Sequence, residues 1–269
     1  MIEHLSVSSV DMFLRCGEQF RRRYIEGEII PPGIAARVGT GLHKGAEANS
    51  KEKISTGHDA PLSVVQDAAR DGYVKAVQSG IFVPAEQRSE AKTLLAQGLD
   101  DSVKLATLYR EEVAPDIMPV AAEKQIVAEV PGLSVPVLGY IDTVTDADEI
   151  RDLKSAGKAW PKNKPHGEHQ PTVYAFLFEY IYGRKPSRFV YDILVNGKKE
   201  SATYMQMETM RDEADFAAWV RIAQTVLRSI SAGVFPPAAP GSFLCSPNFC
   251  GYHSSCPYIN QKRYYSIGG

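Results

Sequence analysis

The stretch that most constrains the fold is residues 139–155, where two β-type segments flank a polar cluster. Residues 137–144 and 149–154 are rich in aliphatic and β-branched side chains, and residues 145–148 between them are Thr-Asp-Ala-Asp. Short runs of this kind, separated by turn residues, are typical of a β-hairpin. We therefore expect an antiparallel hairpin at the centre of the chain.

This hairpin predicts a charged site. A three-residue turn at positions 146–148 makes the pairing symmetric about Ala147 and places Asp142 opposite Asp152, with Cβ atoms about 4.5–5.5 Å apart. Lys154 follows Asp152 by two positions and therefore shares its face. Because opposed like charges destabilise a sheet, the carboxylates indicate a divalent cation, and oxygen ligands favour Mg²⁺ or Mn²⁺. The alternative is an exposed hairpin whose acidic residues only face water.

Composition is that of an ordinary soluble globular protein, with 44% hydrophobic and 23% charged residues. The formal net charge of -2 neither requires nor excludes nucleic acid, because a local basic patch is enough to bind it. The N-terminus lacks a basic segment followed by an apolar one, and the most apolar segment, residues 173–182, is short and contains Glu179. We expect a cytoplasmic protein without a membrane span.

The chain contains four cysteines, which in a reducing compartment are expected to be metal ligands or free thiols rather than disulfides. Cys245, Cys250 and Cys256 fall within twelve residues, and Cys16 lies near the other terminus. Both an iron–sulfur cluster and a zinc ion accept such thiolates. Zinc sites more often use C-x2-C pairs, but the spacing alone leaves zinc open.

Periodicity predicts the other elements. A helix is expected from Ser6 or Ser8 to about Tyr24, a second from about Gly39, and two more within residues 50–115, which we interpret as a helical insertion. Residues 124–130, 135–144 and 149–154 predict an antiparallel meander. A helix then starts at Gln170, and residues 189–195 and 202–207 form a hairpin around a two-residue turn at positions 196–197. A last helix ends at Gly233.

Two polar pairs lie at helical spacing. His43 and Glu47 are four residues apart, as are Gln170 and Tyr174, so the members of each pair share a helix face. Taken singly, each pair also fits an ordinary surface or packing role. Their order relative to the hairpin and the cysteines is more specific.

Taken together, these motifs resemble the PD-(D/E)XK nuclease superfamily, in the RecB-like and AddB-like group that carries an iron–sulfur cluster and includes the nucleases of CRISPR spacer acquisition. The resemblance runs from Ser6 to Cys256. Gly-Tyr-Ile-Asp ending at Asp142 matches the motif of the first acidic metal ligand, and Asp152-Leu-Lys matches the (D/E)-x-K element. The sequence Gly-Leu-His ending at His43 matches an upstream histidine of the metal shell.

The resemblance implies a role for each of these residues. His43, Asp142 and Asp152 would bind the metal, with the Leu153 carbonyl as an additional ligand, and Lys154 would be the catalytic lysine. Gln170 and Tyr174 match a Q-x-x-x-Y helix motif and would position the DNA backbone or the lysine. Glu123, on the preceding strand, is a weaker candidate for the same vicinity. Relatives often have proline where this chain has Gly17, and many have glutamate at the position of Asp152.

The four cysteines match the split set that holds a [4Fe–4S] cluster in these relatives: Cys16, Cys245, Cys250 and Cys256. The cluster would then join the two ends of the chain. The implied fold is α/β, with a restriction-endonuclease-like core in which helices flank a mixed central sheet. We expect a single nuclease domain over residues 1–262, with the insertion at about 50–115, the catalytic core at about 118–232 and the cysteine-rich segment at 240–262.

The implied function is a metal-dependent DNA exonuclease that hydrolyses phosphodiester bonds at DNA ends in recombination, repair or phage DNA metabolism. It would act on single-stranded DNA or duplex ends in a prokaryotic cell or phage-infected host. The chain has no helicase motif, so any unwinding would need a helicase or recombination partner. The alternatives are a CRISPR spacer-acquisition nuclease, a non-catalytic DNA-end-binding module of the same fold, and a zinc-stabilised protein with incidental hairpin carboxylates. Cleavage polarity, strand preference, the number of metal ions and the oligomeric state stay open.

Overall fold

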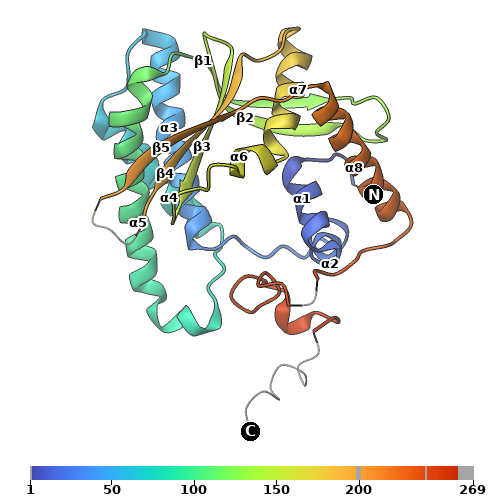
Figure 1. The fold of residues 1–269 in the computed structure, drawn as a ribbon. Coiled ribbons are helices and arrows are strands. Elements are labelled where there is room, and N and C mark those ends of the chain that lie inside the picture. The colour runs from blue at the N-terminus through green and yellow to red at the C-terminus, as the bar shows by residue number, and fades with distance from the viewer. Residues whose placement is uncertain (1, 198–200, 240, 260–269) are drawn as a thin grey trace.

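A mixed five-stranded sheet forms the centre of the computed structural model, which describes residues 2–197, 201–239 and 241–259 (Figure 1). In spatial order the strands are β1 (Pro119–Ala128), β2 (Val137–Thr145), β3 (Glu149–Ala156), β4 (Arg188–Val195) and β5 (Thr203–Thr209). All neighbours are antiparallel except β3 and β4. A parallel pair needs a crossover, and helix α7 (Gln170–Tyr182) lies in it. The chain is α/β, and the predicted meander is confirmed.

The hairpin of β2 and β3 has the predicted register. Two residue pairs join the strands, Thr143 with Arg151 and Val144 with Ile150. This pairing is symmetric about Ala147, as the sequence predicts. It ends at Thr143, so Asp142 and Asp152 lie just beyond the paired residues.

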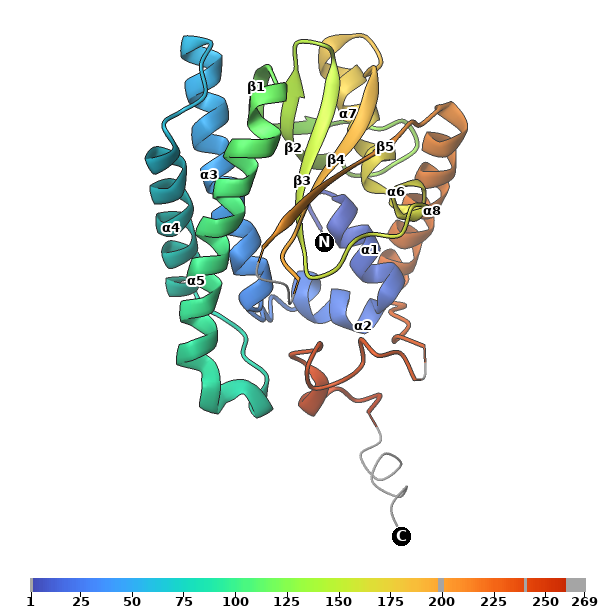
Figure 2. The ribbon, with the colours of Figure 1, turned by 60° about the vertical axis from the view of Figure 1, so that its left-hand side comes forward.

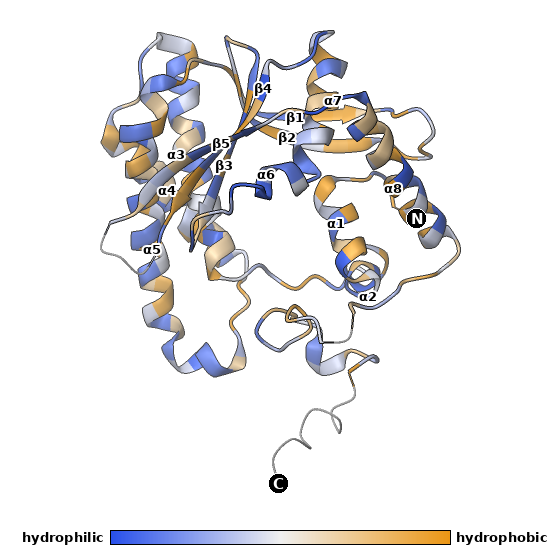
Figure 3. Cartoon of the chain, viewed as in Figure 1, coloured by the Kyte–Doolittle hydropathy of each residue, from blue (hydrophilic) through white to orange (hydrophobic). Residues whose placement is uncertain are grey.

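Helices cover both faces of the sheet (Figures 1 and 2). On one face α3 (Ile34–Thr56), α4 (Leu62–Gln78) and α5 (Ala91–Leu108) form a hydrophobic cluster that includes Leu153 of β3. On the other face α1 (Val7–Arg15), α7 and α8 (Glu213–Ser231) surround a second cluster that includes Ile150. Alternation along β3 thus sends neighbouring side chains to opposite cores. In Figure 3 hydrophobic residues predominate in β4, whereas β3, β5 and the outer helices mix both kinds.

The remaining helical segments are short. They are α2 (Gly17–Phe20), η1 (Arg21–Ile25), η2 (Ala85–Glu90), η3 (Tyr109–Val113), η4 (Ala114–Asp116), α6 (Lys164–Gly167) and η5 (His253–Ser255). Segments η1 and η3 are π-helical, a rare geometry that is frequent at functional sites. Among the helices of the described ranges, none is long and apolar enough to cross a membrane.

The prediction of one continuous helix from Ser6 or Ser8 to about Tyr24 is wrong. It is interrupted at Cys16, whose extended backbone (φ −164°, ψ 100°) ends α1. The Cys16 thiol then caps α2 by accepting the Gln19 backbone N–H at 3.4 Å. The interruption turns the chain at the cysteine, so α1 and α2 are separate helices.

The predicted two-residue turn after β4 is also wrong. Val195 pairs with Thr203, so the connection spans residues 196–202, of which 198–200 lie outside the described residues. The Asn196 N–H donates to the Ala156 carbonyl at 2.8 Å. Position 196 therefore continues the contact between β4 and β3 instead of starting a tight hairpin.

The C-terminal segment of the described chain lies beside α2 (Figure 1). The Gly17 N–H donates to the Pro236 carbonyl at 2.7 Å. Arg22 donates to the Ser255 hydroxyl at 2.8 Å, and its guanidinium lies 4.7 Å from the ring centroid of Tyr252. These contacts fasten the C-terminal segment to α2 and η1. The expected domain end at residue 262 lies outside the described residues.

Candidate functional site

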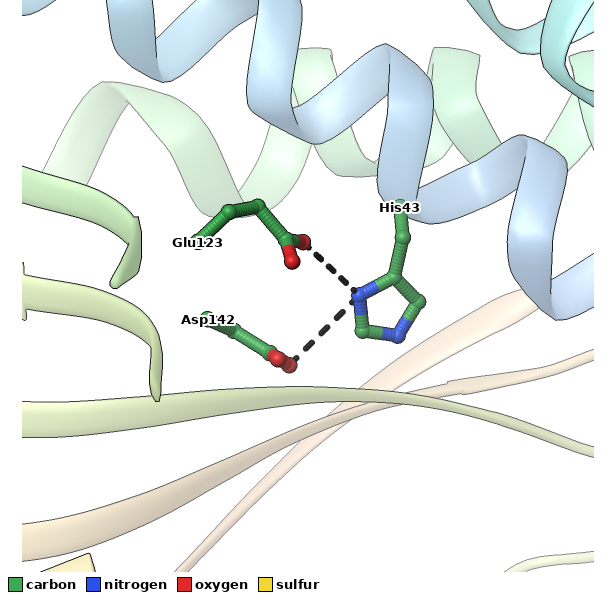
Figure 4. Close-up of side chains that lie close together, drawn as sticks. All are labelled: His43, Glu123 and Asp142. Atoms are coloured by element: carbon green, nitrogen blue, oxygen red, sulfur yellow. Dashed lines mark ion pairs between the residues drawn. The ribbon is translucent and has the colours of Figure 1, made fainter. Parts of the chain in front are cut away.

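Three potential metal ligands from three elements converge on one point (Figure 4). His43 comes from α3, Glu123 from β1 and Asp142 from β2. The His43 Nδ1 atom lies 3.6 Å from Glu123 Oε1 and 3.6 Å from Asp142 Oδ2. One ligand atom from each residue lies within 4.8 Å of the others. A cavity of about 20 Å³ adjoins all three, which is room for one water-sized ligand.

Glu123 reaches this point through an unusual backbone. Its φ of 48° lies in the left-handed region, which costs a non-glycine residue about 1–3 kcal/mol. The flanking residues keep their pairing with β2, Ala122 with Thr143 and Lys124 with Ile141. Glu123 is therefore level with Asp142 across the sheet. Backbone strain at a residue that faces a cavity is typical of a functional site.

Close helix packing fixes the position of His43. A Cβ atom at Gly41 would lie 2.0 Å from the Ser102 hydroxyl oxygen and 2.7 Å from the Ala69 carbonyl oxygen. Only a glycine at this position lets α3 approach α4 and α5 so closely. The Gly-Leu-His sequence thus combines a packing residue with a candidate ligand two positions later.

Asp152 and Lys154 lie beside the three ligands. Asp152 is buried, and its Oδ1 accepts a hydrogen bond from Gln170 Nε2 at 2.6 Å. Its Oδ2 forms an ion pair with Lys154 Nζ at 2.5 Å and has no other protein partner in the described chain. Asp152 Oδ2 is therefore a buried carboxylate oxygen with coordination capacity left over. This oxygen faces Lys154 and is not one of the three ligand atoms of His43, Glu123 and Asp142 that lie within 4.8 Å of one another.

Helix α7 brings Gln170 and Tyr174 to the same region. A Cβ atom at Gly139 would lie 2.4 Å from Leu177 Cδ1 and 3.3 Å from a ring carbon of Tyr174, so this glycine permits close contact between α7 and β2. Burial, and then the charge of Asp152, raises the pKa of Tyr174 to about 12. Tyr174 therefore remains a neutral hydroxyl at neutral pH.

Burial and like charges shift the pKa values of the central groups. Burial, followed by the charge of Asp152, raises the pKa of Asp142 to about 7. Burial alone would lower the pKa of His43, but the carboxylates of Asp142, Glu123 and Asp152 raise it to about 9. Burial would also lower the pKa of Lys154, whereas Asp152 and Asp142 raise it. The site thus concentrates negative charge that a cation stabilises.

The remaining predicted ligand, Leu153, lines the cavity of His43 and Asp142. Its backbone N–H donates to Asp142 Oδ2 at 2.9 Å and holds that carboxylate. Of the predicted residues, the structure therefore brings His43 and Asp142 together directly, with Asp152, Lys154, Gln170 and Tyr174 alongside. It also brings Glu123 to this point, which the sequence favours only as a weaker candidate from its position on the preceding strand.

The four cysteines are half-buried free thiols at the junction of the chain ends. Burial raises the pKa of Cys245, and the thiolates of Cys256 and Cys16 raise it further. Burial raises the pKa of Cys250 as well, and the other three thiols contribute. Within the described ranges, no three of these sulfur atoms lie within 4.8 Å of one another. The structure therefore shows neither a zinc site nor an iron–sulfur site at these four cysteines.

Comparisons with known proteins concern the whole chain. The family model of the PD-(D/E)XK nuclease superfamily matches residues 4–257. A crystal structure of a protein from Eubacterium rectale, described as a "putative exonuclease", has a TM-score of 0.58 at 14% sequence identity, over 99% of this chain and 94% of that one. At such low identity the likeness concerns the fold alone.

A second matched structure, of the protein SSO0001, covers 95% of this chain and 86% of that one at 14% identity, and its TM-score of 0.41 is too low to support a conclusion. No curated protein matches the sequence. The family match spans the sheet, the helices on both its faces and every residue of the site. The chain therefore belongs to the PD-(D/E)XK nuclease superfamily and has its restriction-endonuclease-like α/β fold.

Proposed function

We propose that the protein is a metal-dependent deoxyribonuclease that hydrolyses phosphodiester bonds at DNA ends. The observation that carries the proposal is the convergence of His43, Glu123 and Asp142 on a cavity beside Asp152 and Lys154. One imidazole and the half-buried carboxylates of Glu123 and Asp142 suit a hard divalent ion such as Mg²⁺ or Mn²⁺. The buried Asp152 oxygen beside the Lys154 ammonium and the small cavity also fit a bound cation.

His43, Asp142 and Asp152 would hold this ion, and the Leu153 carbonyl would contribute an additional oxygen. We add Glu123 to this set because its carboxylate converges with the imidazole of His43 and the carboxylate of Asp142. When bound, a divalent ion polarises a phosphate and lowers the pKa of a coordinated water. The Leu153 N–H keeps Asp142 oriented toward the site.

Lys154 acts as a fixed positive charge. Asp152 and Asp142 raise its pKa, so it remains protonated at neutral pH. An ammonium group there can orient the attacking water or stabilise the charge that develops on the phosphate. Gln170 holds Asp152 from the other side through its hydrogen bond, and the Tyr174 hydroxyl can donate to a phosphate oxygen.

We also propose that Cys16, Cys245, Cys250 and Cys256 bind a [4Fe–4S] cluster. One observation supports this: Cys16 and Cys256 lie close enough to Cys245 and Cys250 to raise the pKa values of those two thiols. The cluster would place the chain in the RecB-like and AddB-like group and join the ends of one nuclease domain. Iron and acid-labile sulfide in protein purified without oxygen would support this, whereas stoichiometric zinc would contradict it.

A comparison of linear and covalently closed circular DNA tests the proposed activity. Each DNA, in single- and double-stranded form, is incubated with Mg²⁺, with Mn²⁺ or with EDTA. We expect the linear DNA to be degraded with either metal and the circular DNA to stay intact. Degradation of circular DNA would contradict action at ends. Metal-independent binding to ends without degradation would favour the end-binding module, and the labelled end that is lost first gives the polarity.

A further inference from the structure

A second cavity adjoins the catalytic lysine on the α1 side of the sheet, and we call it the α1 groove. Its volume is about 400 Å³, within the range of about 300–1,000 Å³ that is typical of ligand sites. The N-terminal segment with α1 and η1 forms one wall, and β2 and α7 form the other. Lys154, Gln170 and Tyr174 line it, so it opens directly onto the proposed catalytic residues.

Two exposed tyrosines contribute to the α1 groove. Tyr140 lies on β2, two residues before Asp142, and 46% of its surface is exposed. Tyr24 lies in the π-helical segment η1 on the other wall and is 37% exposed. An aromatic ring on the surface of an enzyme, next to its reactive groups, offers a flat apolar face to a flat ligand. Nucleic-acid bases stack on such rings whatever their sequence.

The charges of the α1 groove are compatible with a phosphate backbone. Two carboxylates line it, and each has a cationic partner: Asp11 lies 2.7 Å from His169 and Glu168 lies 3.5 Å from Lys164. Lys154 also faces the groove. The groove wall therefore presents paired charges, hydroxyl groups and aromatic rings, without an uncompensated acidic patch.

We infer that the α1 groove binds one unstacked nucleotide of the DNA strand next to the scissile phosphate, with its base on the ring of Tyr140 and Tyr24 as the opposite wall. In a duplex, each base is covered by its neighbours and cannot reach such a ring. An unpaired strand can turn a base into the groove. The groove therefore selects single-stranded ends as the substrate. This inference rests on the proposed nuclease function.

Equilibrium binding without hydrolysis tests the inference. Fluorescence anisotropy in EDTA measures the affinity of fluorescein-labelled oligothymidylate for the native protein, Tyr140→Ala and Tyr140→Phe. Tyr180→Ala is the matched control, because Tyr180 is 54% exposed on α7 and does not line the groove. We expect Tyr140→Ala to weaken binding about tenfold, which corresponds to ~1.4 kcal/mol. Tyr140→Phe and Tyr180→Ala should bind like the native protein.

A second probe separates base stacking from backbone contact. It is the same oligonucleotide with every base removed, so that its phosphate charge is unchanged. The native protein should prefer the oligothymidylate, and Tyr140→Ala should reduce this preference by about tenfold. A preference that is equal in both proteins would overturn the inference. So would an equal loss of affinity for blunt duplex DNA, because the ring would then contact the backbone.

The two proposals can fail independently. Affinity that depends on Tyr140, in a protein that degrades no DNA, would uphold the groove and contradict the nuclease function. If the protein degrades DNA but Tyr140→Ala binds the oligothymidylate as the native protein does, the nuclease function would be supported and the proposed role of the α1 groove would be contradicted.

Discussion

At the scale of single residues, the site combines side chains that the sequence indicates strongly with one, Glu123, that it indicates only weakly. Asp142, Asp152 and Lys154 follow from the hairpin pattern, because pairing symmetric about Ala147 brings them to one place. Glu123 depends on the register between β1 and β2 and on a left-handed φ of 48°. Local periodicity predicts neither feature, so the sequence makes Glu123 only a weaker candidate, through its place on the strand that precedes the hairpin.

Replacing Glu123 tests its place in the metal site. Glu123→Gln keeps the size of the side chain but removes its charge, so Mn²⁺ should bind about tenfold more weakly or worse. Calorimetric titration with Mn²⁺ measures this. Glu129→Gln, at an exposed position just beyond β1, is the control and should bind Mn²⁺ normally. Unchanged Mn²⁺ affinity in Glu123→Gln would remove Glu123 from the ligand set.

Gly41 is predicted to be irreplaceable for packing. The added methyl group of Gly41→Ala would meet the Ala69 carbonyl oxygen and the Ser102 hydroxyl, so the helices must separate. Overpacking of this kind costs about 1–3 kcal/mol of unfolding free energy, which urea unfolding measures. Gly157→Ala adds a methyl group in open space and should leave the midpoint nearly unchanged. Equal midpoints for the two variants would show that α3 can move freely.

At the scale of elements, helix and strand positions follow from periodicity, but breaks and contacts do not. The hairpin of β2 and β3 and helix α7 are as predicted. The helical pattern of residues 6–24 continues through Cys16, and only the tertiary contact of Gly17 with Pro236 shows why the chain turns there. The pairing of Val195 with Thr203 similarly overrides the local turn preference of Asn196-Gly197.

The contact between α1 and α7 is predicted to depend on pH. The hydrogen bond that the His169 ring donates to the Asp11 carboxylate raises the pKa of His169 above its usual 6.5, so the protonated ring is favoured in the folded protein. A raised folded-state pKa contributes stability that is complete below pH 6.5 and is lost as the pH rises through the folded-state value. Asp11→Asn should therefore lower the urea midpoint at about pH 5.5 and much less at about pH 9.

The control for this prediction is Asp71→Asn, at an exposed position on α4. It should show the same midpoint as the native protein at both pH values. A loss of stability in Asp11→Asn that is equal at both pH values would mean that the pair acts through packing and not through the charge of His169.

At the scale of the whole molecule, the C-terminal segment of the described chain packs against α2 and η1 beside the nuclease core. The Arg22 guanidinium holds Tyr252 and Ser255, and the cysteines lie in the same junction. Cys16→Ser should therefore lower the content of iron and acid-labile sulfide. Residues 241–259 should become more sensitive to limited proteolysis, because the proposed cluster would no longer add to the contacts that Arg22 and Tyr252 make. Full iron content in Cys16→Ser would exclude it as a ligand.

The central claim, that this site hydrolyses DNA, is tested most directly by the rate at which end-labelled single-stranded DNA is degraded in Mg²⁺. The native protein is compared with Lys154→Met and Asp152→Asn, after urea unfolding has shown that all three are folded. We predict that each substitution lowers the rate about 100-fold or more, because it removes charge from the position where the phosphate reacts. A native rate of degradation in either variant would contradict this account of the site.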